Sequence, residues 1–182
     1  MTTNRQPIRK LLIANRGEIA SRIIRTAREM DIATVAIYSD ADRFAPYVSQ
    51  ADESVHLPGT SPADTYLRVD LVLAAAAVTG ADAVHPGYGF LSENAEFAQA
   101  CADAEVIFVG PSPEAIRSMG SKIAAKDIMR GAGVPVLPGV TVDAGQDADP
   151  DKLRGAAIEI GFPILVKAAF GGGGRGMRIV AD

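Results

Sequence analysis

Short apolar runs alternate with amphipathic stretches along the first part of the chain. Runs without polar alternation occupy residues 10–14, 34–38, 54–57, 83–85 and 106–109. Such runs are typical of strands buried on both faces of a parallel sheet. Stretches that read as helices separate several of these runs, at residues 19–27, 69–78 and 94–104. The alternation predicts an α/β fold with a Rossmann-like open parallel sheet over residues 8–111.

The pattern changes after residue 111, because two helical stretches follow one another without a strand between them. Ser112 is a suitable N-cap and Pro113 a suitable first helical residue. A second helix is predicted at residues 122–130 and ends before a Gly-Ala-Gly sequence. We therefore expect a short helical linker over residues 112–140.

The last part of the chain returns to mixed structure. A polar loop precedes a helix predicted at residues 151–159. Strands are predicted at residues 163–169 and 177–180, on either side of a glycine-rich loop. We therefore divide the chain into residues 1–111, 112–140 and 141–182.

Composition narrows the class of protein. Hydrophobic residues make up 48% of the chain, which is enough to bury a core, and the net charge of -4 disfavours a nucleic-acid partner. Cys101 is the single cysteine, so no internal disulfide can form; its Ala-rich surroundings favour a small helical residue over a reactive thiol. No signal peptide or apolar run of the ~20 residues needed for a membrane helix is present. We expect a soluble, cytoplasmic protein without a membrane partner.

The glycine-rich loop carries the strongest chemical signal. Lys167 lies on the strand that leads into the loop, and four consecutive glycines follow at residues 171–174. Without Cβ atoms, backbone N–H groups can approach a polyphosphate closely, and a nearby lysine can neutralise its charge.

Other glycine motifs fit this segment less well. Neither Gly-Lys-Ser nor Gly-Lys-Thr occurs in the chain, which excludes a Walker A loop. Gly171, Gly173 and Gly176 match the dinucleotide-binding spacing, but a predicted strand follows where that motif requires a helix. A strand–loop–strand flap over nucleotide phosphates is the better interpretation of this segment. The alternative is a flexible hairpin that binds no ligand.

Three further features are ambiguous by themselves. Lys122 lies early in a predicted helix, where lysine is usually solvated. The loops at residues 15–18 and 85–94 follow predicted parallel strands, where open α/β sheets place ligands. Turn formation explains the first loop equally well, and helix capping explains the second. His56 and His85 are isolated and indicate neither a metal site nor a catalytic triad.

Taken together, these segments resemble the biotin carboxylase family. The resemblance is carried by residues 13–20, 85–94, 108–111, 119–122 and 167–177, and it extends from about Arg9 to the end of the chain. Several long motifs in the same order make a chance match improbable.

The resemblance implies an enzyme built of a Rossmann-like front domain, a small ATP-grasp lid and a large C-terminal domain. Residues 1–111 would form the front domain, and residues 141–182 the incomplete start of the lid. Lys122 and Lys167 would contact the phosphates of ATP, and the turn around Gly172, Gly173 and Gly174 would close over them.

The resemblance also implies a reaction and its partners. Such enzymes use ATP with Mg²⁺ (or Mn²⁺) to join bicarbonate to biotin, with carboxyphosphate as the proposed intermediate. Biotin is attached to a separate biotin carboxyl carrier domain. A carboxyltransferase subunit then passes the carboxyl group on to an acyl-CoA or pyruvate. The resemblance also leads us to expect that the full-length protein forms a homo-oligomer. The family's acidic metal ligands, bicarbonate-binding arginine and catalytic glutamate correspond to positions beyond Asp182. We therefore assign no catalytic or metal-ligating residue here and expect the chain alone to be inactive.

One position departs from the family pattern. Phe170 stands where many relatives carry another glycine or a polar residue, which would stiffen the hinge of the loop.

Two other classes remain open at this point. The front domain could serve only as a binding or assembly module, in which case it would ignore ATP. The chain could also belong to another ATP-grasp ligase, such as a carbamoyl-phosphate or purine-biosynthesis enzyme. Bicarbonate- and biotin-dependent release of ADP by the longer protein would distinguish these classes.

Overall fold

The computed structural model describes residues 7–120, 122–139, 149–166 and 177–182. The chain separates into two compact units, Met1–Ile116 and Arg117–Asp182. We describe each unit by itself.

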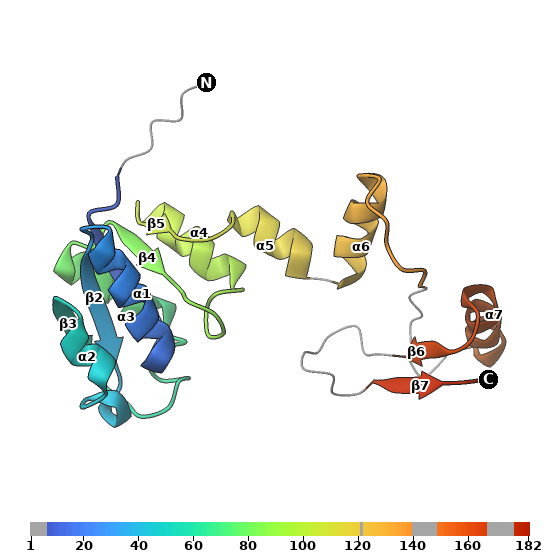
Figure 1. The fold of residues 1–182 in the computed structure, drawn as a ribbon, viewed down its shortest axis with the longest axis horizontal. Helices are drawn as coiled ribbons and strands as arrows, with labels where there is room; N and C mark the ends of the chain where they lie inside the picture. Colours follow the sequence, from blue (N-terminus) through green and yellow to red (C-terminus); the bar gives the residue numbers. More distant parts are fainter. Residues whose placement is uncertain (1–6, 121, 140–148, 167–176) are drawn as a thin grey trace, which may run out of the picture. The chain divides into compact units, whose positions relative to one another are not determined.

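The first unit is built on a five-stranded parallel sheet (Figure 1). Its strands lie side by side in the order β3-β2-β1-β4-β5, and every pair is parallel. The strands are β1 (Lys10–Ile13), β2 (Ala33–Tyr38), β3 (Glu53–His56), β4 (Ala83–His85) and β5 (Ile107–Phe108). The sequence-based prediction of a Rossmann-like open parallel sheet is confirmed.

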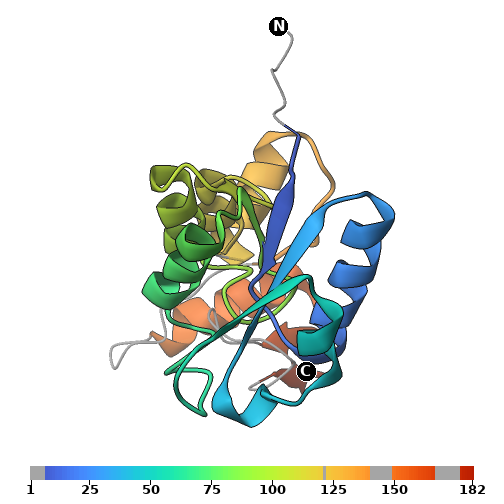
Figure 2. The same cartoon turned by 90° about the vertical axis from the view of Figure 1, so that its left-hand side faces the viewer.

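Helices cover both faces of this sheet. They are α1 (Gly17–Glu29), α2 (Pro46–Gln50), α3 (Val69–Thr79) and α4 (Ala95–Asp103). Figure 2 shows α1 and α2 on one face and α3 and α4 on the other. The side chains of β1 alternate accordingly: Leu12 joins the core under α3 and α4, whereas Leu11 and Ile13 face α1.

Several helix ends are set by the residues that the sequence indicated. Gly80 ends α3 in the left-handed conformation, with φ of 65°. Asn94, rather than Ser92, caps α4, because its side chain accepts a hydrogen bond of 2.9 Å from the Phe97 N–H. The Ser112 hydroxyl accepts a hydrogen bond of 3.2 Å from the Ala115 N–H at the start of α5 (Pro113–Gly120), as predicted.

Two short elements between β2 and β3 were not predicted. They are the 3-10 turn η1 (Asp40–Asp42) and the helix α2. Neither is long enough to show a helical repeat of apolar positions. Pro46 at the first turn of α2 and the buried Tyr47 behind it fix this helix against the sheet.

The second unit contains α6 (Lys122–Gly131), α7 (Pro150–Ile160) and an antiparallel hairpin of β6 (Ile164–Val166) and β7 (Arg178–Val180). In the hairpin, Ile164 pairs with Val180 and Val166 pairs with Arg178. The unit boundary falls inside α5. None of the helices in the described part of the chain combines the length and apolarity needed to cross a bilayer.

Candidate functional site

The order of the strands creates a switch point between β1 and β4. The chain leaves β1 toward one edge of the sheet and later crosses to the other edge, so the loops after β1 and β4 lie next to each other at the carboxyl end. Open α/β sheets bind ligands at such points. The two loops singled out in the sequence, residues 15–18 and 85–94, are the loops that meet here.

Asn15 joins the two loops. Its side chain is buried and donates hydrogen bonds from Nδ2 to the Pro86 carbonyl (2.8 Å) and the Tyr88 carbonyl (3.0 Å). Its Oδ1 accepts a bond of 2.9 Å from the Arg16 N–H. The Asn15 amide therefore does more than form a local turn, because it fixes the second loop against the end of β1.

Gly87 is required by this contact. Its φ of 67° lies in the left-handed region, and a Cβ atom would lie 2.6 Å from Asn15 Nδ2 and 2.8 Å from Ile19 Cγ2. Distances of this kind do not occur in well-packed structures, so a side chain at this position would push Asn15 away. The short sequence Pro-Gly after β4 thus permits a close approach of two loops.

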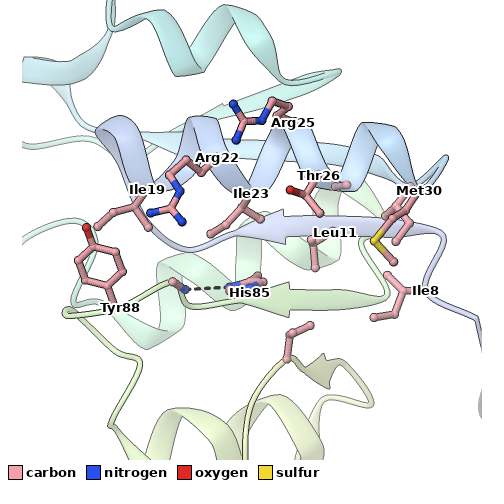
Figure 3. Close-up of a pocket in the computed structure, with 14 residues that line it drawn as sticks. Ile8, Leu11, Ile19, Arg22, Ile23, Arg25, Thr26, Met30, His85 and Tyr88 are labelled. Atoms are coloured by element: carbon pink, nitrogen blue, oxygen red, sulfur yellow. Dashed lines mark hydrogen bonds between the residues drawn. The ribbon is translucent and has the colours of Figure 1, made fainter.

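The second loop places Tyr88 at the surface. Tyr88 is 59% exposed, and its hydroxyl donates a hydrogen bond of 2.6 Å to Glu18 Oε1 at the start of α1. This bond, together with partial burial and the Glu18 charge, raises the pKa of Tyr88. Figure 3 shows the Tyr88 side chain near Ile19 of α1.

A polar network lies at the carboxyl end of the neighbouring strand β2. The Asp42 carboxylate pairs with the Arg16 guanidinium, accepts a bond of 2.5 Å from the Tyr66 hydroxyl and one of 3.0 Å from the Ser39 hydroxyl. The Tyr66 oxygen in turn accepts a bond of 2.9 Å from the Ser39 N–H and lies 3.0 Å from the Tyr47 hydroxyl. Every group in the network thus has a partner, as buried polar groups require.

The charge states in this network follow from its geometry. Burial raises the pKa of Tyr66, and its hydrogen bond to Asp42 adds to this effect. Burial also raises the pKa of Tyr47. For Arg16, burial opposes the charge, but the hydrogen bond and charge of Asp42 outweigh it and raise the pKa of the guanidinium. The network therefore combines one ion pair with two neutral phenols.

The two histidines and the cysteine have local contacts or buried surroundings in the first unit. The His85 Nδ1 accepts a bond of 3.0 Å from the Gly87 N–H, and burial lowers the pKa of His85, which keeps the ring neutral (Figure 3). His56 pairs with Asp40 at 2.6 Å. Cys101 is buried in α4, where burial raises the pKa of its thiol to about 11. Within the described ranges, no group of three or more His, Cys, Asp or Glu side chains could hold a metal ion.

The predicted phosphate-binding residues fall mostly outside the described ranges. Lys167, Gly172, Gly173 and Gly174 are not described, and Lys122 begins α6 without a described side chain. The described strands β6 and β7 form the antiparallel pair expected on either side of this loop.

Sequence reasoning missed the contacts that organise the first unit. It singled out Asn15 and the 85–94 loop but not the bond between them, and it gave no role to Asp42 or Tyr66. Asp42 and Tyr66 lie 24 positions apart, and no repeat or motif links them.

Two family models match the chain in sequence order. The N-terminal domain of biotin carboxylase matches residues 7–116, and the ATP-binding domain of the carbamoyl-phosphate synthase L chain matches residues 121–182. The two matches together account for nearly the whole chain, with a biotin carboxylase front domain first and an ATP-binding segment after it. The chain belongs to the biotin carboxylase family.

Relatives and solved structures agree with this assignment. Biotin carboxylase from Pseudomonas aeruginosa is 51% identical over 175 residues, covering 96% of this chain and 38% of that protein. The mitochondrial methylcrotonoyl-CoA carboxylase subunit alpha from Arabidopsis thaliana is 52% identical over 180 residues, covering 99% of this chain and 24% of that protein. A biotin carboxylase–βγ-ATP complex from Campylobacter jejuni superposes with a TM-score of 0.88 at 46% identity, covering 97% of this chain and 39% of that chain.

The chain therefore spans well under half the length of these relatives. Another solved relative is the biotin carboxylase domain dimer of the Hydrogenobacter thermophilus 2-oxoglutarate carboxylase with MgADP, ADP and bicarbonate. It has a TM-score of 0.86 at 44% identity and matches 98% of this chain and 38% of its own. The family thus accounts for both units of the chain, including the one that follows the front domain.

Proposed function

We propose that this chain is the front part of an ATP-dependent biotin carboxylase, a ligase that carboxylates biotin on a carrier domain at the expense of ATP and bicarbonate. The observation that carries the proposal is the match of 51% identity to a biotin carboxylase over 96% of the chain. Family membership favours this reaction over that of another ATP-grasp ligase.

In this proposal, the second unit binds the triphosphate of ATP. The strands on either side of the glycine-rich segment in the sequence, β6 and β7, pair in an antiparallel ladder that includes Val166 and Arg178. A strand pair of this kind supports the proposal of a phosphate-covering flap. We assign Lys167 and Lys122 to the phosphate charges, and Gly172, Gly173 and Gly174 to close backbone approach.

The chemistry explains why such a segment is useful. Bicarbonate is a poor electrophile, and its phosphorylation supplies a leaving group. Phosphoryl transfer depends mainly on positioning and on neutralising charge, which lysines and backbone amides provide, while a closed flap excludes water.

The metal ion and the catalytic groups would come from elsewhere in the full-length enzyme. The described residues offer no cluster of three metal-ligating side chains, so we assign no step to Mg²⁺ or Mn²⁺ through them. The chain spans 38% of a biotin carboxylase, and we propose that it is inactive alone. In the cell it would act with a biotin carboxyl carrier domain and a carboxyltransferase subunit, as a cytoplasmic homo-oligomer in acyl-CoA carboxylation for fatty acid metabolism.

The test uses the full-length enzyme and the 182-residue chain side by side. We expect the full-length enzyme to release ADP in a reaction that requires both bicarbonate and free biotin, and the 182-residue chain to show no bicarbonate-dependent ATP turnover. Bicarbonate-dependent turnover by the short chain would contradict the second expectation. ADP release by the full-length enzyme that does not depend on biotin would contradict the first expectation.

Lysine variants of the full-length enzyme test the residue assignments. Lys122→Gln and Lys167→Gln should each raise the KM for ATP or lower kcat by at least about tenfold, equivalent to about 1.4 kcal/mol of lost phosphate stabilisation. Lys126→Gln is the matched control, because Lys126 lies on the same helix α6 and its Nζ contacts the Leu137 carbonyl at 3.4 Å. Equal effects at all three positions would refute the assignment.

A further inference from the structure

Phe90 has an unusual backbone conformation in the loop after β4. Its φ of 41° lies in the left-handed region, which is rare for a residue with a large side chain. It takes the first central position of a turn that is closed by a hydrogen bond of 2.9 Å from the Ser92 N–H to the Gly89 carbonyl. At positive φ this position favours glycine, asparagine or aspartate. Phenylalanine raises the free energy of the backbone here, so contacts of its side chain must offset that cost.

The contact that offsets this cost is a stack of two aromatic rings. The ring centroids of Phe90 and Tyr66 lie 5.2 Å apart, and the ring planes differ by 5°. Tyr66 is 1% exposed, and its hydroxyl is fixed by a hydrogen bond of 2.5 Å to Asp42 and one of 2.9 Å from the Ser39 N–H. The stack therefore ties the loop after β4 to the polar network at the carboxyl end of β2.

The exposed segment Tyr88–Gly89 lies between two anchored positions. On one side, Gly87 packs against Asn15, whose Nδ2 bonds to the carbonyls of Pro86 and Tyr88. On the other side lies the aromatic stack. A Cβ at Gly89 would meet none of the described atoms within 4 Å, so the space beside this segment is open. The loop thus presents a short exposed segment, held at both ends, at the switch point of the sheet.

We propose that Phe90 is a positioning residue for the carboxylation of biotin: its stack on Tyr66 holds the loop after β4 in the conformation that the biotin-dependent step requires. Phe90 acts through the loop and need not touch a substrate itself. The inference rests on the proposed function, in which the phosphates of ATP are assigned to the second unit. The switch point of the first unit is then left for the other substrates.

The surroundings of the loop favour biotin over bicarbonate. The hydroxyl of Tyr88 is paired with the Glu18 carboxylate at 2.6 Å, and a negative charge at this position disfavours a small anion. An exposed aromatic ring and open backbone groups suit a molecule that joins an apolar ring to a neutral urea group. We therefore expect the stack to affect the use of biotin and not the use of ATP.

Variants of the full-length enzyme test this role by ADP release measured against biotin and against ATP. Phe90→Leu keeps an apolar side chain but loses the stacked ring, and we expect it to lower kcat/KM for biotin at least about tenfold without changing KM for ATP. Phe90→Tyr keeps the ring and should retain most of the natural kcat/KM. Phe108→Leu is the matched control, because it breaks an aromatic contact of 5.7 Å with Phe97 in the same unit that does not involve the stack. The control should leave kcat/KM for biotin unchanged.

A glycine variant separates positioning from stability. Glycine adopts a φ of 41° without strain, so Phe90→Gly loses the ring but recovers free energy in the backbone. Its unfolding midpoint should lie closer to that of the natural enzyme than the midpoint of Phe90→Leu. We nevertheless expect both variants to show a loss of kcat/KM for biotin, because both lack the stack.

Three results would overturn the inference: an unchanged kcat/KM for biotin in Phe90→Leu and Phe90→Gly, an equally large rise in their KM for ATP, or an equal loss in Phe108→Leu. The last two would indicate a general disturbance of the fold. The unsubstituted enzyme is measured in the same series. If its ADP release does not depend on biotin, the proposed function itself is wrong, whereas biotin-dependent release that the Phe90 variants retain refutes only the role of the stack.

Discussion

The contact between Gly87 and Asn15 gives the sharpest prediction about the first unit. Gly87 and Gly89 lie in the same loop with nearly the same backbone conformation, with φ of 67° and 68°. They differ in surroundings: a Cβ at Gly87 would lie 2.6 Å from Asn15 Nδ2, whereas a Cβ at Gly89 would meet nothing within 4 Å. Alanine substitutions at the two positions therefore share the backbone cost and differ in the clash.

The magnitudes follow from these two terms. Alanine in the left-handed region costs about 1–2 kcal/mol at either position. At Gly87 the clash also displaces Asn15, whose Nδ2 bonds to Pro86 and Tyr88 would be lost inside the protein. A buried donor left without a partner costs about 1–3 kcal/mol. We expect Gly87→Ala to lower the free energy of unfolding by about 2–5 kcal/mol and Gly89→Ala by about 1–2 kcal/mol.

Urea unfolding followed by tyrosine fluorescence is a suitable assay. The chain has no tryptophan, and its four tyrosines, Tyr38, Tyr47, Tyr66 and Tyr88, all lie in the first unit. The signal therefore reports that unit without interference from residues 117–182. Equal losses of stability for Gly87→Ala and Gly89→Ala would show that Asn15 does not hold the loop in the way described.

Two further predictions concern buried groups of the first unit. Tyr66→Phe removes a hydroxyl that donates to Asp42 and accepts from the Ser39 N–H, and it should lower the free energy of unfolding by about 1–3 kcal/mol. The exposed control Tyr88→Phe should lower it by less than about 0.5 kcal/mol. Similar losses for both variants would contradict the described network. Burial raises the pKa of Cys101 to about 11 from about 9, so the thiol stabilises the fold below the lower value, and this contribution is lost as the pH rises toward the higher one. The unfolding free energy of the natural chain should therefore fall more steeply between pH 9 and 11 than that of Cys101→Ala, and parallel curves would count against a buried thiol.

The sequence predicted the sheet well because its three central strands, β2, β1 and β4, are largely buried. Residues 10–14, 34–38 and 83–85 are continuous apolar runs. Short runs of this kind, with helical stretches between them, are typical of buried strands in a parallel sheet. Helix ends followed from local chemistry, as at Gly80 and Asn94. The short α2 escaped prediction because five residues cannot show a helical period.

Function was predicted by a different route. The residues of the motifs and their order along the chain indicated the family, which the comparisons confirmed. The roles of Lys122, Lys167 and the glycine turn came with the resemblance and stay predictions, because Lys167, the glycines and the side chain of Lys122 lie outside the described ranges.

The sequence by itself therefore determined the strands, most helix ends and the family, since these depend on residues close together in the chain or on motifs read in order. Only the tertiary structure decided that Asn15 holds the loop after β4 and that Asp42 joins Arg16 and Tyr66. Those features depend on which strands become neighbours. Local hydrophobic patterns do not encode that pairing. Every buried parallel strand is a similar continuous apolar run, so the pattern does not say which strands become neighbours.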